Sequence, residues 1–129
     1  MFTAQTYSEE EKSKVYDEML RLMKLTSRQN KDVVLDATFH KNHIREKFVK
    51  EAKKRDRVFV IEVYADEELV KERLSLSRET SDADFEVYKA IKKDWQPFND
   101  QHFTLRSTNN NITEMLERTA DYLFTTNDK

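Results

Sequence analysis

The stretch of sequence that decides the fold class is Arg57-Val58-Phe59-Val60-Ile61-Glu62-Val63. Its β-branched and aromatic residues occupy both alternating faces, which is typical of a strand that is covered on both sides. We therefore expect a central or near-central strand here. A small helical adaptor protein would require this stretch to be something other than a strand, and its residue types argue against that interpretation.

Two shorter apolar runs accompany it, Asp32–Asp36 before it and Phe103–Arg106 after it. The first is too short for a helix and contains β-branched residues, so we expect a strand buried on both faces. The second is expected to be a third strand. Five segments with helical spacing surround the strands; they run from about Ser8 to Ser27, from Lys41 to about Lys54, from Asp66 to Leu76, from Ser81 or Asp82 to Trp95, and from Ile112 to Phe124.

The order of these elements defines the fold class. Strands that alternate with helices pair in parallel through right-handed crossovers, so the sequence predicts an α/β protein with a three-layer parallel sheet and flanking helices. A chain of 129 residues has the size of one ordinary domain. We therefore expect a single domain over residues 1–129.

The balance of residue types excludes several classes of function. A net charge of −2, with basic and acidic residues interspersed, argues against nucleic-acid binding by charge alone, although a nucleic acid could still be a substrate. The absence of cysteine excludes disulfides, thiolate zinc sites and cysteine catalysis. No run approaches the roughly 18 apolar residues of a membrane span, so we expect a soluble, cytoplasmic protein.

The chain contains no glycine, where average usage would give roughly nine. Its turns must therefore use residues that tolerate left-handed backbone or bond to their own backbone, for which Asn30, Asp56, Asn99 and the run 109–111 are the candidates. The absence of glycine also excludes a serine nucleophile elbow, a dinucleotide-binding loop and a phosphate-binding loop, because all three are built around glycines.

Three charged residues are candidates for a ligand-binding or catalytic role, namely Asp36, Arg73 and Arg78. Asp36 ends a predicted strand, where a carboxylate can hold Mg²⁺ or a hydroxyl; alternatively it caps the next segment of the chain. Arg73 and Arg78 flank the connection between two helices and could close over a polyphosphate. Arginines at the end of a surface helix are also common, because they complement the helix dipole.

Other candidates carry weaker signals. His40 and His43 are three residues apart, which invites a metal site, but no third ligand stands in a fixed pattern and exposed histidines at a helix start are the competing interpretation. Trp95 could stack on a base, or it could be an aromatic residue of the core.

A resemblance to a known family rests on three parts of the sequence, which are Val33-Val34-Leu35-Asp36-Ala37-Thr38-Phe39, then Arg45, then Ser81-Asp82-Ala83-Asp84. The stretch from about Tyr16 to Leu123 resembles the P-loop kinase-like proteins often labelled AAA-family ATPases, relatives of polynucleotide 5′-kinases and zeta-toxin kinases. The resemblance implies use of ATP and Mg²⁺ and phosphate transfer to a hydroxyl acceptor. The acceptor could be a nucleic-acid end, a sugar nucleotide or another small hydroxyl compound.

The same resemblance implies roles for five residues. Asp36 and Arg78 would be catalytic, and Asp36 would also hold Mg²⁺ indirectly. Thr38, Arg45 and Arg73 would contact the nucleotide. Arg73 and Arg78 match the lid arginines that contact ATP phosphates in the family.

The family's phosphate-binding segment has no counterpart in the chain. Such kinases begin with a strand, a Gly-x-x-x-x-Gly-Lys-Ser/Thr loop, a helix and a second strand. The resemblance therefore implies an N-terminally truncated domain, an incomplete P-loop NTPase-like sheet that lacks the first two strands and the loop. The lost loop strand would lie between residues 32–36 and 57–63, where each unsatisfied backbone group costs roughly 1 to 3 kcal/mol.

Two outcomes are compatible with the gap in the sheet. Either the two strands pair directly in a rearranged sheet, or a separately encoded N-terminal half supplies the loop and its strand. We expect the chain alone to be inactive, with weak or no ATP binding. The alternative is a non-catalytic remnant or an interaction module that does not bind nucleotides.

Overall fold

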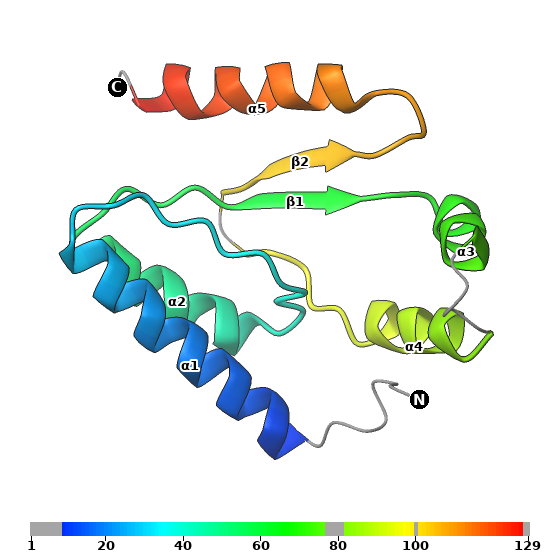
Figure 1. Cartoon of the computed structure of the whole chain (residues 1–129), viewed down its shortest axis with the longest axis horizontal. Helices are drawn as coiled ribbons and strands as arrows, with labels where there is room; N and C mark the ends of the chain where they lie inside the picture. Colours follow the sequence, from blue (N-terminus) through cyan, green and yellow to red (C-terminus); the bar gives the residue numbers. More distant parts are fainter. Residues whose placement is uncertain (1–8, 77–81, 100, 128–129) are drawn as a thin grey trace. The chain divides into compact units, whose positions relative to one another are not determined.

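The computed structural model describes residues 9–76, 82–99 and 101–127. The elements run in the order α1 (Glu9–Arg28), α2 (Asn42–Lys53), β1 (Ile61–Tyr64), α3 (Glu67–Leu76), α4 (Asp82–Lys93), β2 (Phe103–Arg106) and α5 (Ile112–Asn127), as labelled in Figure 1. The chain divides into two compact units, unit 1 (1–58 and 86–99) and unit 2 (59–85 and 100–129). A single domain over the whole chain stays a prediction.

Unit 2 is built around a pair of parallel strands. β1 and β2 pair in the register Ile61 with Phe103 through Tyr64 with Arg106, which confirms the predicted parallel pairing and the bounds of the third strand. The predicted strand over 57–63 is only partly right, because β1 begins at Ile61. A strand is delimited by its partner, and β2 offers only four residues to pair with.

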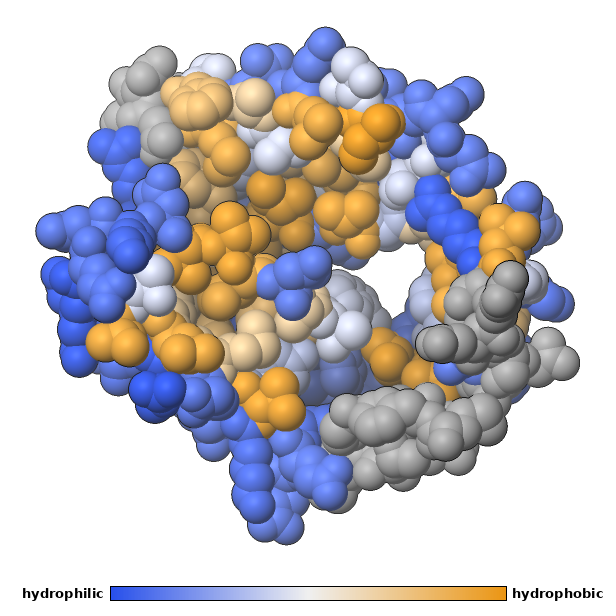
Figure 2. Space-filling view, viewed as in Figure 1, coloured by the Kyte–Doolittle hydropathy of each residue, from blue (hydrophilic) through white to orange (hydrophobic). Residues whose placement is uncertain are grey.

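Helix α5 covers one face of this strand pair. The ring of Tyr122 stacks on Phe103 with centroids 4.6 Å apart and meets Phe59 edge-on at 5.7 Å. Leu105 of β2 is 4% exposed and forms the buried centre of unit 2. The cover is incomplete, since Figure 2 shows apolar side chains that remain at the surface over α5 and the strands beside it.

Unit 1 contains α1 and α2, which pack against each other (Figure 1). Its buried apolar side chains, within the part of the chain that the structure describes, are Met23 and Phe48. Ser27 of α1 donates a hydrogen bond to the carboxylate of Asp56, 2.5 Å away, just after α2. Asn30 follows α1 with φ of 59°, so an asparagine takes the left-handed position that a glycine commonly fills, as the composition predicted.

The predicted strand over Asp32–Asp36 is wrong. Residues 31–36 form no strand, and Val34 is 92% exposed. The physical reason is the absence of a neighbour: no other strand lies within the described residues of unit 1, and a run meant for burial on both faces gains nothing without one.

The helix predictions are largely confirmed. The observed bounds of α1, α2 and α3 lie within about one residue of the predicted ones. Helix α4 ends at Lys93, so Trp95 lies beyond it, and α5 runs three residues past Phe124 to Asn127. The predicted caps at Ser8 and Ser81 lie outside the described residues. No helix in the described ranges is long and apolar enough to cross a membrane.

Candidate functional site

The segment from Asp36 to Arg45 carries three of the five predicted site residues and belongs to unit 1. Asp36 is exposed. Thr38 places its hydroxyl 3.2 Å from the hydroxyl of Tyr16, and the backbone N–H of Phe39 donates to the same Tyr16 oxygen at 3.1 Å. Tyr16 of α1 therefore anchors the residues that come directly after the unpaired run.

Phe39 adopts a left-handed backbone conformation with φ of 44°. Such a conformation is rare for a bulky residue and costs on the order of 1 to 3 kcal/mol. The ring of Phe39 packs 5.3 Å from that of Tyr16 and 5.1 Å from that of Phe48. These aromatic contacts hold Phe39 in its left-handed conformation and so fix the turn between Asp36 and Arg45.

Arg45 of α2 is buried, with 7% of the residue exposed. Its guanidinium donates to the carbonyl of Phe39 at 2.5 Å, to the side-chain oxygen of Asn42 at 2.7 Å and to the carbonyl of Gln96 at 2.5 Å. The same group lies 4.7 Å from the ring centre of Trp95 and 4.0 Å from that of Phe98. Arg45 thus ties the turn at Phe39 to residues 95–98.

Gln96 completes this connection and was missed by the sequence reasoning. Its backbone N–H donates to the carbonyl of His40 at 2.9 Å, and its side-chain oxygen accepts from the N–H of Asn42 at 2.6 Å. Gln96 lies beyond α4 and before Pro97, so no periodic pattern includes it. Nothing local in the sequence marks a polar residue whose partners are more than fifty positions away.

His40 lies beside the same connection. Burial and the positive charge of Lys41 lower the pKa of His40, and the carboxylate of Asp94 opposes them. Its Nδ1 is buried without a hydrogen-bond partner among the described residues, and Nε2 is 3.7 Å from Asp94. His40 is therefore not the exposed histidine that the sequence suggested, whereas His43 is exposed. No group of three metal-ligating residues occurs in the described ranges.

Arg73 belongs to unit 2 and lies on α3. It donates to the hydroxyl of Ser107 at 3.2 Å and to the carbonyl of Thr108 at 2.9 Å. These residues come directly after β2, so Arg73 stands at the carboxyl end of a parallel strand, where open α/β sheets bind ligands. Arg78, the other predicted lid arginine, lies outside the described residues.

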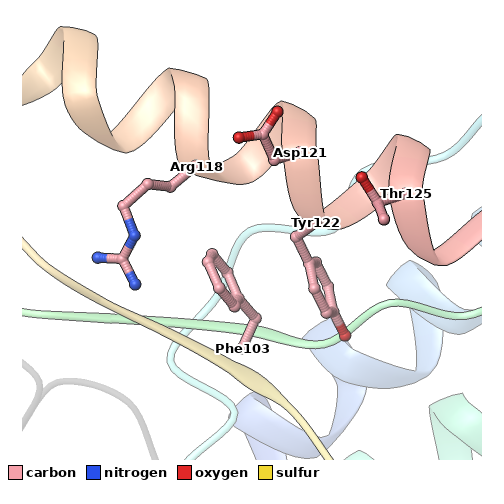
Figure 3. Close-up of a pocket in the computed structure, with 5 residues that line it drawn as sticks. All are labelled: Phe103, Arg118, Asp121, Tyr122 and Thr125. Atoms are coloured by element: carbon pink, nitrogen blue, oxygen red, sulfur yellow. The ribbon is translucent and has the colours of Figure 1, made fainter.

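An open hollow lies between α5 and β2 (Figure 3), and none of the predicted site residues lines it. Its lining residues are Phe103, Arg118, Asp121, Tyr122 and Thr125. The rings of Phe103 and Tyr122 are nearly parallel, at 8°, and the Arg118 guanidinium lies 5.3 Å from the Phe103 ring. Because these groups already stack on one another, the hollow offers little free surface to a ligand.

The residues of this chain alone do not fit ATP and Mg²⁺. There is no glycine to build a phosphate loop, and the guanidinium of Arg45 is held by acceptors of the chain itself. In the part of the chain that the structure describes, no acidic cluster could hold a metal ion. The roles predicted for Asp36, Thr38, Arg45, Arg73 and Arg78 stay predictions.

A family model described as an AAA domain matches residues 2–98, more than half of the 129-residue chain. The chain therefore belongs to this AAA-domain family of P-loop NTPase-like proteins, which points to a kinase- or ATPase-like domain whose relatives use ATP and Mg²⁺. The matched range includes Asp36 and the predicted lid arginines and ends before β2 and α5. No curated protein and no solved structure matches the chain.

Proposed function

We propose that this chain is part of a kinase-type P-loop domain, which transfers phosphate from ATP to a hydroxyl acceptor only when another segment supplies the glycine-rich loop and its strand. The family membership supports the class of domain. The complete absence of glycine supports the need for a second segment, because the backbone of the phosphate loop is built around glycines.

The observation that carries the proposal is that residues 32–36 form no strand. This run precedes the Asp-Ala-Thr motif and has the composition of a buried strand, yet it has no strand partner in the described part of unit 1 and leaves Val34 92% exposed. Apolar residues gain stability only when they are removed from water. A run of this kind is therefore suited to pair with a strand that another segment supplies.

In the completed domain, Asp36 and Arg78 are the proposed catalytic residues, with Asp36 also holding Mg²⁺ indirectly. Thr38, Arg45 and Arg73 are proposed to face the nucleotide. Arg73 already stands at the carboxyl end of β2, which supports its role. Arg45 would first have to release the carbonyls of Phe39 and Gln96, so its contribution in the present arrangement is to position the turn after Asp36.

Calorimetry tests the first half of the proposal. Titration of the chain alone with MgATP should give no measurable binding heat, because the loop that would surround the phosphates is missing. Micromolar affinity for MgATP would contradict the proposal.

Reconstitution tests the second half. The chain is mixed with a polypeptide that carries a strand, a Gly-x-x-x-x-Gly-Lys-Ser loop and a helix, and phosphate transfer to hydroxyl acceptors is measured. Asp36→Asn should lower the rate by about 100-fold or more, because it removes the carboxylate that is proposed to hold Mg²⁺ indirectly beside the transferred phosphate. Asp32→Asn changes the other end of the same run in the same way and should leave the rate unchanged.

The second candidate is a non-catalytic interaction module, favoured by the occupied guanidinium of Arg45. The nucleotide sequence preceding the first codon discriminates between the two. An open frame that encodes a glycine-rich loop supports the kinase, whereas its absence supports the interaction module.

A further inference from the structure

Two segments of unit 1 are rich in basic residues. Residues 24–31 contain three basic residues and no acidic one, and residues 50–57 contain five basic residues and two acidic ones. The two segments together have a net charge of +6, whereas the whole chain has a net charge of −2. The strength of this positive region therefore depends on whether the fold brings the two segments together.

The fold places the two segments side by side. Ser27 of α1 donates a hydrogen bond to the carboxylate of Asp56, just after α2. One turn before Ser27, the ammonium group of Lys24 lies 3.9 Å from the carboxylate of Glu51. The two helices therefore run parallel and end next to each other (Figure 1). The two basic segments form one continuous part of the surface of unit 1.

The carboxylate of Glu51 shows how closely the cations gather. The hydrogen bond and the charge of Lys54 lower the pKa of Glu51, whereas burial raises it. The charges of Lys24 and Lys50 lower this pKa further. Three ammonium groups, from α1, from α2 and from the turn after α2, therefore share one carboxylate. The local charge is positive, because one carboxylate cannot neutralise three cations.

Three further cations stand beside this group. Arg28 lies one turn after Lys24 on the same face of α1. Lys53 and Arg55 are the neighbours of Lys54 in the sequence. All three are exposed and form no ion pair within the residues that the structure describes. The six cations form what we call the basic patch, which consists of Lys24, Arg28, Lys50, Lys53, Lys54 and Arg55.

The ends of the two helices account for only part of this positive charge. Cations near the last turn complement the negative end of a helix dipole, which is equivalent to about half an elementary charge. Two helix ends, Glu51 and Asp56 balance about three of the six cations. The remaining cations repel one another, and an anionic partner removes that repulsion. The basic patch is therefore suited to bind a molecule with several negative charges.

The arrangement of the patch favours a nucleic acid over a membrane. Packed helices have axes about 8 to 10 Å apart, so the cations stand in two rows whose spacing falls within the range of DNA groove widths, about 6 to 12 Å. A membrane would also meet the rest of the chain, whose net charge is −8 because the whole chain has −2 and the two segments have +6. The two segments contain no aromatic residue that could stack on a base.

We propose that the basic patch binds the phosphate backbone of double-stranded nucleic acid without sequence preference. This binding requires neither ATP nor a glycine-rich loop, so it is independent of the proposed function. The patch is also separate from the predicted site residues, since Lys53 follows Arg45 by eight residues, or about 12 Å of helix. The net charge of the whole chain gave no sign of it, because the surplus forms only where the two segments meet.

The test measures the fluorescence anisotropy of a labelled DNA duplex of mixed sequence, about 20 base pairs long, titrated with the full chain. At about 50 mM salt we expect a dissociation constant of about 10⁻⁵ M or lower. If four to five phosphates are contacted, raising the salt to about 200 mM should weaken binding by about 100-fold or more. A second duplex of unrelated sequence should bind equally well.

Two double variants locate the contact. Arg28→Gln with Lys50→Gln removes two cations of the basic patch, and it should weaken binding at least about tenfold and make the salt dependence less steep. Lys12→Gln with Lys14→Gln makes the same change of charge at the beginning of α1 and should alter the affinity by less than about twofold. Circular dichroism should show the same melting temperature for the patch variant as for the parent chain, because neither substituted side chain forms an ion pair among the described residues.

Each other outcome overturns the proposal. Absence of binding at about 50 mM salt, or binding that does not depend on salt, means that the patch does not contact phosphates. Equal weakening by the two double variants means that the duplex binds elsewhere. If vesicles with anionic lipids bind the chain and the duplex does not, the partner is a membrane surface and the proposal is wrong. None of these results affects the proposed function.

Discussion

Two regions of this chain have the composition of a buried strand, and only one of them is a strand. In unit 2, Ile61–Tyr64 pairs with Phe103–Arg106 and lies under α5. In unit 1, residues 32–36 carry the same kinds of side chain but have no strand partner within the described part of that unit and leave Val34 92% exposed. A strand is formed by a pair of segments, so a strand-like sequence without its partner stays irregular.

The largest expected effect comes from the buried centre of the paired region. Leu105→Ala should destabilise unit 2 by about 2 to 5 kcal/mol, because it leaves a cavity at a side chain that is 4% exposed. Val34→Ala shortens an apolar side chain of the unpaired region and should cost less than about 0.5 kcal/mol. Urea unfolding followed by circular dichroism measures both. Equal losses would mean that residues 32–36 are packed after all.

A smaller loss of stability is expected at Arg45, whose hydrogen bonds hold the turn that follows residues 32–36. Arg45→Lys removes the planar guanidinium that bonds to the carbonyls of Phe39 and Gln96, and we expect a loss of about 2 to 3 kcal/mol. Arg21→Lys makes the same exchange at an exposed ion pair with Glu18 and should cost less than about 0.5 kcal/mol. If urea midpoints of the two variants coincide, Arg45 does not hold the turn.

The turn that leads from α1 into the unpaired region gives a further prediction. Asn30 has φ of 59°, and Asn30→Ala should destabilise unit 1 by about 1 kcal/mol because alanine resists the left-handed conformation. Asn30→Gly should be neutral or slightly stabilising, since glycine adopts it without strain. Thermal melts distinguish the two. Equal melting temperatures for both variants would show that the backbone at this position is not left-handed in solution.

The smallest effect depends on pH. Burial and Lys41 lower the pKa of His40, so the folded protein binds this proton less readily than the unfolded chain. The stability linked to His40 is therefore complete above the unfolded pKa of about 6.5 and is lost as the pH falls through the lower folded pKa. His40→Gln should flatten this decline in urea midpoints, and His43→Gln, at an exposed position, should not. An unchanged slope for His40→Gln would contradict the assignment.

The helices could be predicted from the sequence because their hydrogen bonds and apolar spacing are local. The segment Phe103–Arg106 was also predicted correctly, and its partner was found with an error at its beginning. Whether residues 32–36 form a strand could not be predicted from their own composition, because strand formation depends on a neighbouring strand. The burial of Arg45 escaped prediction for a related reason, since Gln96, Trp95 and Phe98 come from a distant part of the chain.

The predicted site rests on the family motif more than on the observed geometry. The motif assigns five residues to one nucleotide-binding site, whereas in the structure Arg45 donates to carbonyls of the chain itself and Arg73 bonds to residues at the end of β2. A glycine-rich loop would supply the group that brings such residues to one ligand. Its absence is the physical reason why the site is predicted and not observed.

The most direct test of the missing strand partner is hydrogen exchange at the amides of residues 33–35, measured for the chain alone and with the strand–loop–helix polypeptide. We predict rapid exchange in the chain alone, in contrast to slower exchange in β2, and strong protection of 33–35 once the polypeptide is bound. Protection of 33–35 in the chain alone, equal to that of β2, would contradict the claim that this run lacks its strand partner.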